Sequence, residues 1–435
     1  MIRSRLVAWL AVVALVFMAS PAAAQTPTPA PTPTPKVVDP ADAFFDDTVL
    51  HEIRLTINSK DWQTLKDHYL ENDYYPTDFR WRDQVVRNIG IRSRGTGSRL
   101  GIKPGLRVDF DRYVTGGEFL GLKSFILRNQ SQDASNIHER LSMLFFHRMG
   151  LPASREAHTR LYVNNQYVGL YSIVEPIDKI FLKKIFNEND GWLYKYDYNA
   201  DDKPYYFEDR GSDPNLYMPH PFKPETNESD PQPGPIAELV RIINHDSDAI
   251  FRQTIAAYLD LQKFIKHIAI ETFLGDDDGI LGGFGMNNYY LYRFEKKNLF
   301  TIIAWDKSNA FNEGPEKSIF PNLYDRPEAQ RNRLMMRALG YDDLKDLYLD
   351  TLVDCAKSAS ATADSASPTA PVSPDTPGWL EREIVREYNQ IRDAALADPQ
   401  KPYSNLDFEK GVEDLKTFAR QRSDFVKGEV AKVRP

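Results

Sequence analysis

The spacing of the apolar residues changes half-way along the chain, and this change limits the folds that the chain can adopt. The first half favours strands, as in residues 49–58 (VLHEIRLTIN), where apolar and polar residues alternate. The second half mainly repeats its apolar residues with helical spacing. Strands gathered in one half and helices in the other predict an α+β fold in two layers or lobes. A cleft between two such lobes is the usual place for a ligand.

The expected strands of the first half are short segments separated by glycine and proline. They lie at residues 49–58, 85–94, 105–110, 123–127, 159–163 and 167–174. Two helices are expected among them, at residues 61–70 and 135–149. The helices expected in the second half lie at residues 178–185, 236–243, 261–273, 329–339, 341–354, 380–397 and 408–430. A β-hairpin at residues 288–293 and 299–305 interrupts them, and residues 197–234 predict an irregular loop.

The first 24 residues have the pattern of a secretory signal peptide. Arg3 and Arg5 precede an apolar run, and small residues precede Gln25. The apolar run is shorter than the roughly 20 residues that a membrane-spanning helix needs. We therefore expect residues 1–24 to be removed and the protein to be secreted, to the periplasm or to the outside of the cell.

Two further segments have compositions that do not favour packing. Residues 25–40 include alternating Pro and Thr, which favours an extended linker. Residues 358–377 are rich in Ala, Ser, Thr and Pro and predict a disordered insertion. The remaining chain is expected to form an N-lobe at residues 41–177 and a C-lobe at residues 178–435.

The net charge and the cysteine content exclude several classes of protein. The 54 Lys and Arg residues against 62 Asp and Glu give a net charge of −8, which argues against a nucleic-acid partner. No stable membrane insertion is expected after the signal peptide is removed. Cys355 is the one cysteine, so neither an intrachain disulfide nor a multi-cysteine zinc site can form, and its helical context favours a small buried residue. No H-E-x-x-H or G-x-S-x-G motif indicates a hydrolase.

Acidic and amide side chains meet at the hairpin of the second half. Asp276, Asp277 and Asp278 follow an apolar helix, Asn288 begins the first strand, and Asp306 follows the second. Hairpin geometry places Asn288 close to Asp306, and the acidic loop can fold back beside them. Carboxylate and amide oxygens suit Mg²⁺ or Mn²⁺. The alternative interpretation is an acidic surface turn.

Cations gather around a Gly/Ser/Thr turn in the first half. Arg92, Arg94, Arg99 and Lys103 flank or follow the sequence GTGS at residues 95–98. The backbone N–H groups of such a turn and the neighbouring cations can hold phosphate. The alternative interpretation is a mobile hairpin with solvated cations. The spacing matches neither a Walker A loop nor a Rossmann fingerprint.

Four stretches, in this order, resemble the CotH (spore-coat protein H-like) kinase family. Together they extend over roughly residues 48–315. They are IRSRGTGS at 91–98 with Lys103-Pro104, DASNIHERL at 133–141 with GLP at 150–152, LYVNNQYVGLYSIVEPID at 161–178, and NNYYLY at 287–292 with IAWD at 303–306.

The resemblance implies an atypical bilobal, protein-kinase-like fold with a strand-rich N-lobe and a helix-rich C-lobe. Such a protein binds ATP with Mg²⁺ or Mn²⁺ and transfers the γ-phosphoryl group. By the resemblance, Lys103 matches the lysine that holds the α- and β-phosphates, and Glu139 is its partner on a helix. Arg94 lies in the same phosphate-binding segment. Glu175, at the junction of the lobes, is placed to contact the adenine or the ribose.

The resemblance also assigns the acidic residues. Asp278 matches the catalytic aspartate that orients the acceptor hydroxyl, with Asp276 as the alternative because the loop is longer here. Asn288 and Asp306 match the residues that hold the metal ions. This division of roles agrees with the needs of phosphoryl transfer, which are neutralised phosphates and an oriented nucleophile.

Two departures from the family pattern bear on turnover. The W-D-x-D motif reads Trp305-Asp306-Lys307-Ser308 here, so the second aspartate is lost, and Lys307 brings a positive charge beside the expected metal ligand. The interval from Asp278 to Asn288 is also longer than usual.

Three hypotheses of function follow. The first is a secreted kinase that phosphorylates Ser or Thr of an envelope or extracellular protein. The second is a catalytically inactive, kinase-like surface or structural binding module, which Ser308 and the 12% aromatic content favour. The third is a calcium-stabilised fold in which the Asp cluster is structural.

Overall fold

The computed structural model describes residues 39–197, 204–283, 285–320, 327–328, 331–362 and 376–434. The expected signal peptide at 1–24, nearly all of the linker at 25–40 and most of the insertion at 358–377 lie outside these residues. The features described below belong to the unit that begins at Pro40.

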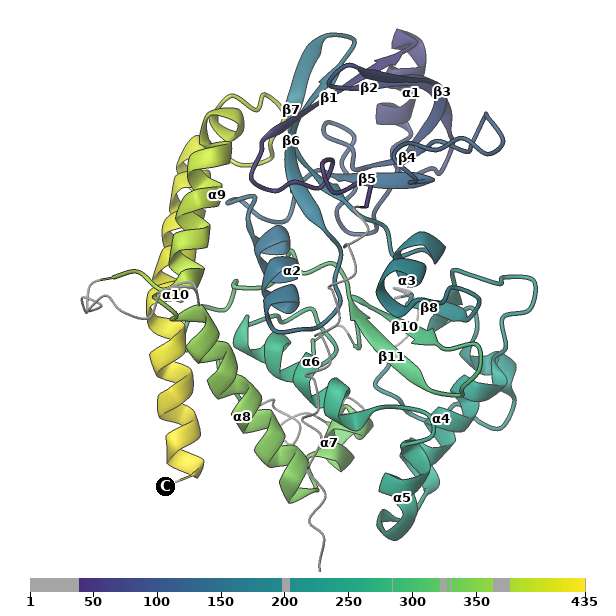
Figure 1. The fold of residues 1–435 in the computed structure, drawn as a ribbon, viewed down its shortest axis with the longest axis vertical. Coiled ribbons are helices and arrows are strands. Elements are labelled where there is room, and N and C mark those ends of the chain that lie inside the picture. Colours follow the sequence, from purple (N-terminus) through teal and green to yellow (C-terminus); the bar gives the residue numbers. More distant parts are fainter. Residues whose placement is uncertain are drawn as a thin grey trace, which may run out of the picture. The chain divides into compact units, whose positions relative to one another are not determined.

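Seven strands of the first half close into a barrel (Figure 1), in the order β1-β2-β3-β4-β5-β7-β6. Their bounds are β1 His51–Ile57, β2 Tyr75–Trp81, β3 Gln84–Ser93, β4 Leu106–Asp109, β5 Ser124–Arg128, β6 Glu156–Val163 and β7 Gln166–Val174. The strands β1 and β6 pair in parallel and close the barrel, whereas all other neighbours pair antiparallel. The strand β2 was missed in the sequence, where Pro, Asp and Arg interrupt its apolar pattern.

Aromatic side chains fill the barrel. The ring of Phe44 lies edge-on to those of Trp81, Phe119 and Phe125, with centroids 5.4, 5.3 and 5.0 Å away. Phe79 packs against the same group. Such contacts add to the free energy gained by burying the rings. The segment that precedes the first strand is therefore part of the barrel core.

Two helices accompany the barrel, α1 (Ser59–Asp67) and α2 (His138–Arg148). The N-terminus of α2 is held by Asp133, whose Oδ2 accepts hydrogen bonds from the backbone N–H groups of Ile137 and His138. Most side chains of α2 are buried, including Glu139 and Arg140. Charged side chains that are buried need partners within the protein, and those partners shape the site described below.

The second half combines a small sheet with helices. The sheet has the order β11-β10-β8-β9. Its bounds are β8 Trp192–Tyr196, β9 Phe222–Pro224, β10 Tyr289–Arg293 and β11 Phe300–Ala304. The helices are α3 Lys179–Phe186, η1 Pro214–Tyr217, α4 Gly234–His245, α5 Asp248–Ile255, α6 Leu261–Phe273, α7 Arg333–Ala338, α8 Asp342–Ala359, α9 Trp379–Leu396 and α10 Asn405–Val433. The expected hairpin and the expected α+β class are confirmed, whereas β8, β9 and α5 were not expected.

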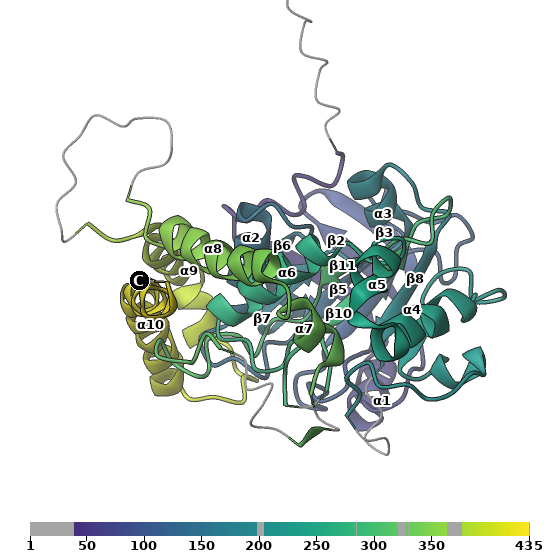
Figure 2. The ribbon, with the colours of Figure 1, turned by 90° about the horizontal axis from the view of Figure 1, so that it is seen from below.

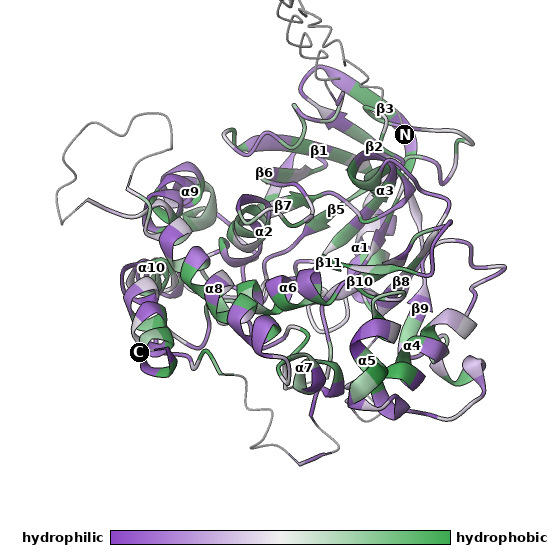
Figure 3. Ribbon diagram, turned by 60° about the horizontal axis from the view of Figure 1, so that its bottom comes forward, coloured by the Kyte–Doolittle hydropathy of each residue, from purple (hydrophilic) through white to green (hydrophobic). Residues whose placement is uncertain are grey.

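The last three helices, α8, α9 and α10, lie side by side (Figures 1 and 2). Hydrophobic and hydrophilic residues alternate along them (Figure 3), because one face of each helix packs on the core. Cys355 on α8 is fully buried, as its context predicted. The helix also includes Ser358 and Ala359, so the first residues of the expected disordered insertion are helical. Over the described residues, no helix combines the length and the apolar character needed to cross a membrane.

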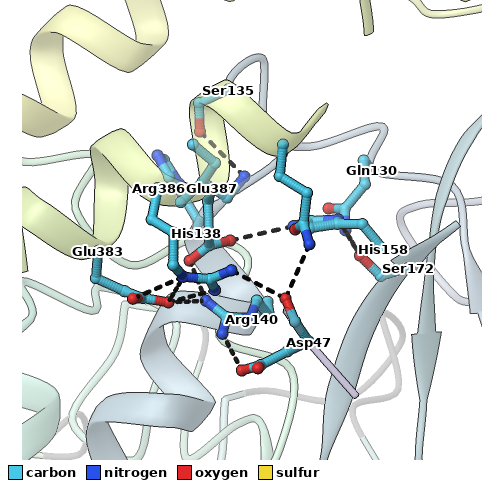
Figure 4. A network of polar contacts seen from close by, with 12 residues as sticks. Asp47, Gln130, Ser135, His138, Arg140, His158, Ser172, Glu383, Arg386 and Glu387 are labelled. Carbon is cyan, nitrogen blue, oxygen red and sulfur yellow. Dashed lines mark hydrogen bonds and ion pairs between the residues drawn. The ribbon is translucent and has the colours of Figure 1, made fainter. Parts of the chain in front are cut away.

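Arg140 connects α2 to the helix α9 and to the segment before β1 (Figure 4). Its guanidinium contacts the carboxylates of Glu383 and Glu387 on α9 and that of Asp47. Glu387 also lies 3.1 Å from Nε2 of His158 on β6. The Arg140 side chain is only 2% exposed, so these carboxylates replace the water that it loses.

Replacing Arg140 by Met is expected to lower the free energy of unfolding by about 3–5 kcal/mol, because it leaves the fully buried carboxylate of Glu387 without its arginine partner. Denaturant unfolding measures this change. Arg434→Ala is the control: Arg434 binds Asp346 and Asp350 at the surface, and its loss is expected to cost less than about 1 kcal/mol. Equal losses in the two variants would contradict the structural role of Arg140.

Candidate functional site

A cavity of about 550 Å³ brings together segments that are far apart in the sequence. Its lining includes residues 94–99 after β3, residues 176–178 after β7, residues 195–197 from β8, and residues 287–288 before β10. Asp278 and Asp306 also line it. A volume of this size is typical of small-molecule sites.

One side of the cavity carries oxygen and amide groups. The pairing of Tyr289 with Ala304 places Asn288 beside Trp305. The backbone N–H of Trp305 donates to the backbone carbonyl of Asn288 at 3.2 Å. The side-chain amide of Asn288 donates to Oδ2 of Asp278 at 2.9 Å. The structure thus brings Asp278, Asn288 and Asp306 to one cavity, as the hairpin geometry predicted.

Asp278 is surrounded by three asparagine amides. Besides Asn288, Asn287 donates to its Oδ1 at 2.9 Å and Asn309 donates to its Oδ2 at 3.0 Å. Within the described part of the chain, no cation forms an ion pair with Asp278. The carboxylate is therefore oriented by neutral donors and keeps its charge available to a ligand.

Two oxygens on this side accept no hydrogen bond from any described residue: Oδ2 of Asp306 and Oδ1 of Asn288. Around them, the residues that the structure describes include no cluster of three or more His, Cys, Asp or Glu side chains suited to a metal ion. Mg²⁺ is commonly held by one or two carboxylates together with water and phosphate oxygens. The free oxygens of Asp306 and Asn288 fit that requirement.

The cavity lining also includes two cations whose side chains have no acceptors. Arg94 follows β3 and Lys195 lies on β8, and both line the cavity. Neither has a hydrogen-bond acceptor or an ion-pair partner among the described residues. Burial and the neighbouring Arg128 lower the pKa of Arg94 to about 10, and burial and Arg94 lower that of Lys195. Two half-buried cations whose side chains have no acceptors favour the binding of an anion.

Arg128, at the end of β5, connects the acidic side of the cavity to α2. Its Nη1 donates to Oδ1 of Asp306 at 2.6 Å, and its Nε lies 2.5 Å from Oε2 of Glu139. Burial raises the pKa of Asp306, but Arg128 and Arg94 outweigh this effect and hold the pKa at about 2. Asp306 is therefore a carboxylate at neutral and at mildly acidic pH.

Lys307 does not bring a positive charge to the cavity, contrary to the expectation from the sequence. Its ammonium is fully buried and lies 2.5 Å from Glu271 and 2.9 Å from Asp276. Asp306 has a left-handed backbone (φ 50°), so the alternation of faces along β11 ends there and Lys307 turns away. Asp276 is occupied by this buried ion pair and does not line the cavity, whereas Asp278 does.

The expected ion pair between Lys103 and Glu139 is not present. The Lys103 ammonium lies 2.7 Å from Asp398, just after α9, and is 1% exposed, while Glu139 pairs with Arg128. Neither Lys103 nor Glu139 is among the described residues that line the cavity. The assignment of Lys103 to the phosphates therefore stays a prediction.

Glu175 is buried beside the cavity and does not line it. It forms ion pairs with Arg155 and Lys184, whereas the three residues that follow it, 176–178, line the cavity. The assignment of Glu175 to the adenine or the ribose also stays a prediction.

Three residues of the site were missed in the sequence: Arg128, Lys195 and Asn309. Arg128 ends a strand that is otherwise apolar, and Lys195 interrupts the aromatic run WLYKY. A cation inside a buried strand is unusual and was the available signal. Asn309 carries no such signal, since an asparagine is ordinary in a turn.

Comparisons with known proteins relate the chain to one family. Residues 91–359 match the family model described as CotH kinase protein. A curated relative, the inner spore coat protein H of Bacillus subtilis (strain 168), is 22% identical over 374 residues, which are 86% of this chain and 96% of that protein.

Two solved structures show weaker likenesses. The proinflammatory kinase CtkA of Helicobacter pylori has a TM-score of 0.26 and 10% identity, over 76% of this chain and 95% of that one. The HipA, HipB and operator DNA complex of the Shewanella oneidensis MR-1 toxin–antitoxin system has a TM-score of 0.37 and 14% identity, over 78% and 68%. These scores are too low to establish a shared fold.

The low pKa of Asp306 gives a testable dependence of stability on pH. Its folded-state pKa of about 2 lies below the ordinary value of 3.8, so its contribution is fully present above about pH 4 and is lost as the pH falls through about 2. The stability difference between the wild type and Asp306→Asn is expected to shrink by about 2 kcal/mol over that range. Denaturant unfolding between pH 5 and pH 2 measures it, and parallel curves would contradict the ion pair with Arg128.

Proposed function

The chain belongs to the CotH kinase family, and from this premise we propose that it is an active kinase that transfers the γ-phosphoryl group of ATP to Ser or Thr of a protein. We further propose that the acceptor protein lies in the cell envelope or outside the cell. The expected signal peptide and the spore-coat relative support that location.

The single observation that carries the proposal is the distribution of charge in the cavity. Arg94 and Lys195, whose side chains have no acceptors among the described residues, line the same cavity as Asp278 and Asp306. A triphosphate with a divalent cation needs both groups at once: cations for its oxygens and carboxylates for the metal. The cavity offers both within about 550 Å³.

Each acidic residue receives one role in this proposal. Asp278 accepts the proton of the acceptor hydroxyl or orients that hydroxyl, and the amides of Asn287, Asn288 and Asn309 fix its position. Asp306 and Asn288 hold Mg²⁺ or Mn²⁺ through Oδ2 and Oδ1. The bound cation would neutralise the negative charge of the phosphates.

Apolar residues next to the polar groups suit the base of the nucleotide. Ile126, Ile177 and Tyr290 line the cavity together with Trp305. We propose that residues 41–177 form the N-lobe and that the later residues form the C-lobe, with residues 176–178 as the hinge between them.

The alternative function is a kinase-like module that binds without turnover. Ser308 stands where the family has a second aspartate, and its hydroxyl donates to Oδ1 of Asp306 at 3.1 Å. The loss of that carboxylate weakens the case for a second metal ion. The alternative predicts binding of ATP without any transfer of phosphate.

The chain without the expected signal peptide, residues 1–24, is predicted to gain thermal stability with Mg-ATP. A ligand that binds only the folded state stabilises that state. Asp306→Ala is expected to abolish this gain. Asp278→Asn is expected to keep the gain but to lower phosphate transfer from γ-labelled ATP at least about 100-fold.

The acceptors for that transfer assay are an envelope extract and the protein itself. No thermal shift at high Mg-ATP would contradict the proposal. A shift without any transfer would favour the inactive module, and stabilisation by Ca²⁺ alone, with no effect of nucleotide, would favour the calcium-stabilised fold.

Arg94→Met and Lys195→Met are each expected to weaken ATP binding about tenfold or more, because each removes a charged donor to the phosphates. Binding of adenosine is expected to change little. Lys223→Met is the matched control, since Lys223 also lines the cavity but already pairs with Glu225. Equal losses for adenosine and ATP would show that these cations do not bind the phosphates.

A further inference from the structure

The residue that connects the parts of the site is buried and lies behind it. Arg128 is 4% exposed and is not among the described residues that line the cavity. Its guanidinium lies 5.5 Å from the centre of the Trp305 ring, and its buried Nη2 has no hydrogen-bond partner. An arginine in this position acts on a ligand through its neighbours, and Asp306 is the cavity residue to which it donates a hydrogen bond.

The carboxylate of Asp306 needs a neighbouring residue that fixes its direction. Its left-handed backbone is uncommon for a residue other than glycine and costs of the order of 1 kcal/mol or more. Its Oδ1 is held by Arg128 at 2.6 Å and by the hydroxyl of Ser308 at 3.1 Å, and its Oδ2 is left for a ligand. One oxygen is thus used for orientation and the other remains available.

The other end of the guanidinium is fixed to a helix that is itself anchored. Glu139 on α2 lies 2.5 Å from Nε of Arg128. The next residue, Arg140, binds Asp47 and the α9 residues Glu383 and Glu387 (Figure 4). The position of α2 therefore determines the position of Arg128, and through it the direction of the Asp306 carboxylate.

We propose that Arg128 is the positioning residue for the cation site: with the Glu139 carboxyl group beside its Nε, it directs the free oxygen of Asp306 toward the divalent cation. The inference rests on the proposed function, because it assigns Asp306 to the cation. Partners behind a metal ligand commonly contribute 10- to 100-fold to metal affinity or activity.

The test measures binding of Mn²⁺ to the full chain by electron paramagnetic resonance, with ATP present. Arg128→Gln is expected to raise the Kd for Mn²⁺ about tenfold or more, and Arg128→Lys to recover part of the loss. Binding of ATP without a cation, measured in EDTA, is expected to stay within about twofold of the wild type. A general loss of structure in the cavity would weaken both the binding of Mn²⁺ and the binding of ATP in EDTA.

Arg293→Gln is the matched control. Arg293 also ends a strand, is 6% exposed and lies over a tryptophan, Trp192, at 3.8 Å. It is not among the described residues that line the cavity, so its loss is expected to leave the Kd for Mn²⁺ unchanged. If Arg128→Gln does not fold, Arg128→Lys and Glu139→Gln take its place in the experiment. Each is expected to raise the Kd for Mn²⁺ by a smaller factor.

The outcomes separate this inference from the proposed function. Equal Mn²⁺ affinity in the wild type and in folded Arg128 variants would overturn the role of Arg128 alone. An equal loss of cation-free ATP binding would also overturn it. A wild type that binds no Mn²⁺ would overturn both proposals.

Discussion

Buried charge is the constraint on which this structure depends. A cation removed from water needs a carboxylate, and here most of those carboxylates lie far away in the sequence. The pairs are Lys103 with Asp398, Arg128 with Asp306, Arg140 with Glu387, and Lys307 with Glu271. Each pair fixes the position of one segment relative to another. Of the described cations that line the cavity, Arg94 and Lys195 have neither a carboxylate nor any other acceptor for the side chain, and this exception marks the site.

The sequence predicted the parts of the site that depend on neighbouring segments. Asn288 and Asp306 begin and end a single hairpin, so strand pairing alone brings them together. Asp278 lies ten residues before Asn288, so a short loop is enough to bring it back to the same end of the hairpin. The α+β class followed in the same way from the change in apolar spacing. These features depend on local pattern, which a single sequence contains.

The sequence could not predict contacts that depend on the whole chain. Nothing near Lys103 indicates Asp398, which lies 295 residues later and binds its ammonium. The direction of Lys307 depends on the left-handed backbone of Asp306, which a single sequence does not reveal for an aspartate. Arg128 was missed because one of its two carboxylates lies on a helix and the other lies just after a strand of another sheet.

The two C-terminal helices, α9 and α10, lie beyond the residues that match the family model, 91–359. Even so, this region supplies the carboxylates for Lys103 and Arg140 in the first half of the chain. Contacts of such high sequence separation are costly in chain entropy. Without residues 383–398, Lys103 and Arg140 would be buried without these carboxylates. The first half of the chain is therefore not a self-sufficient folding unit.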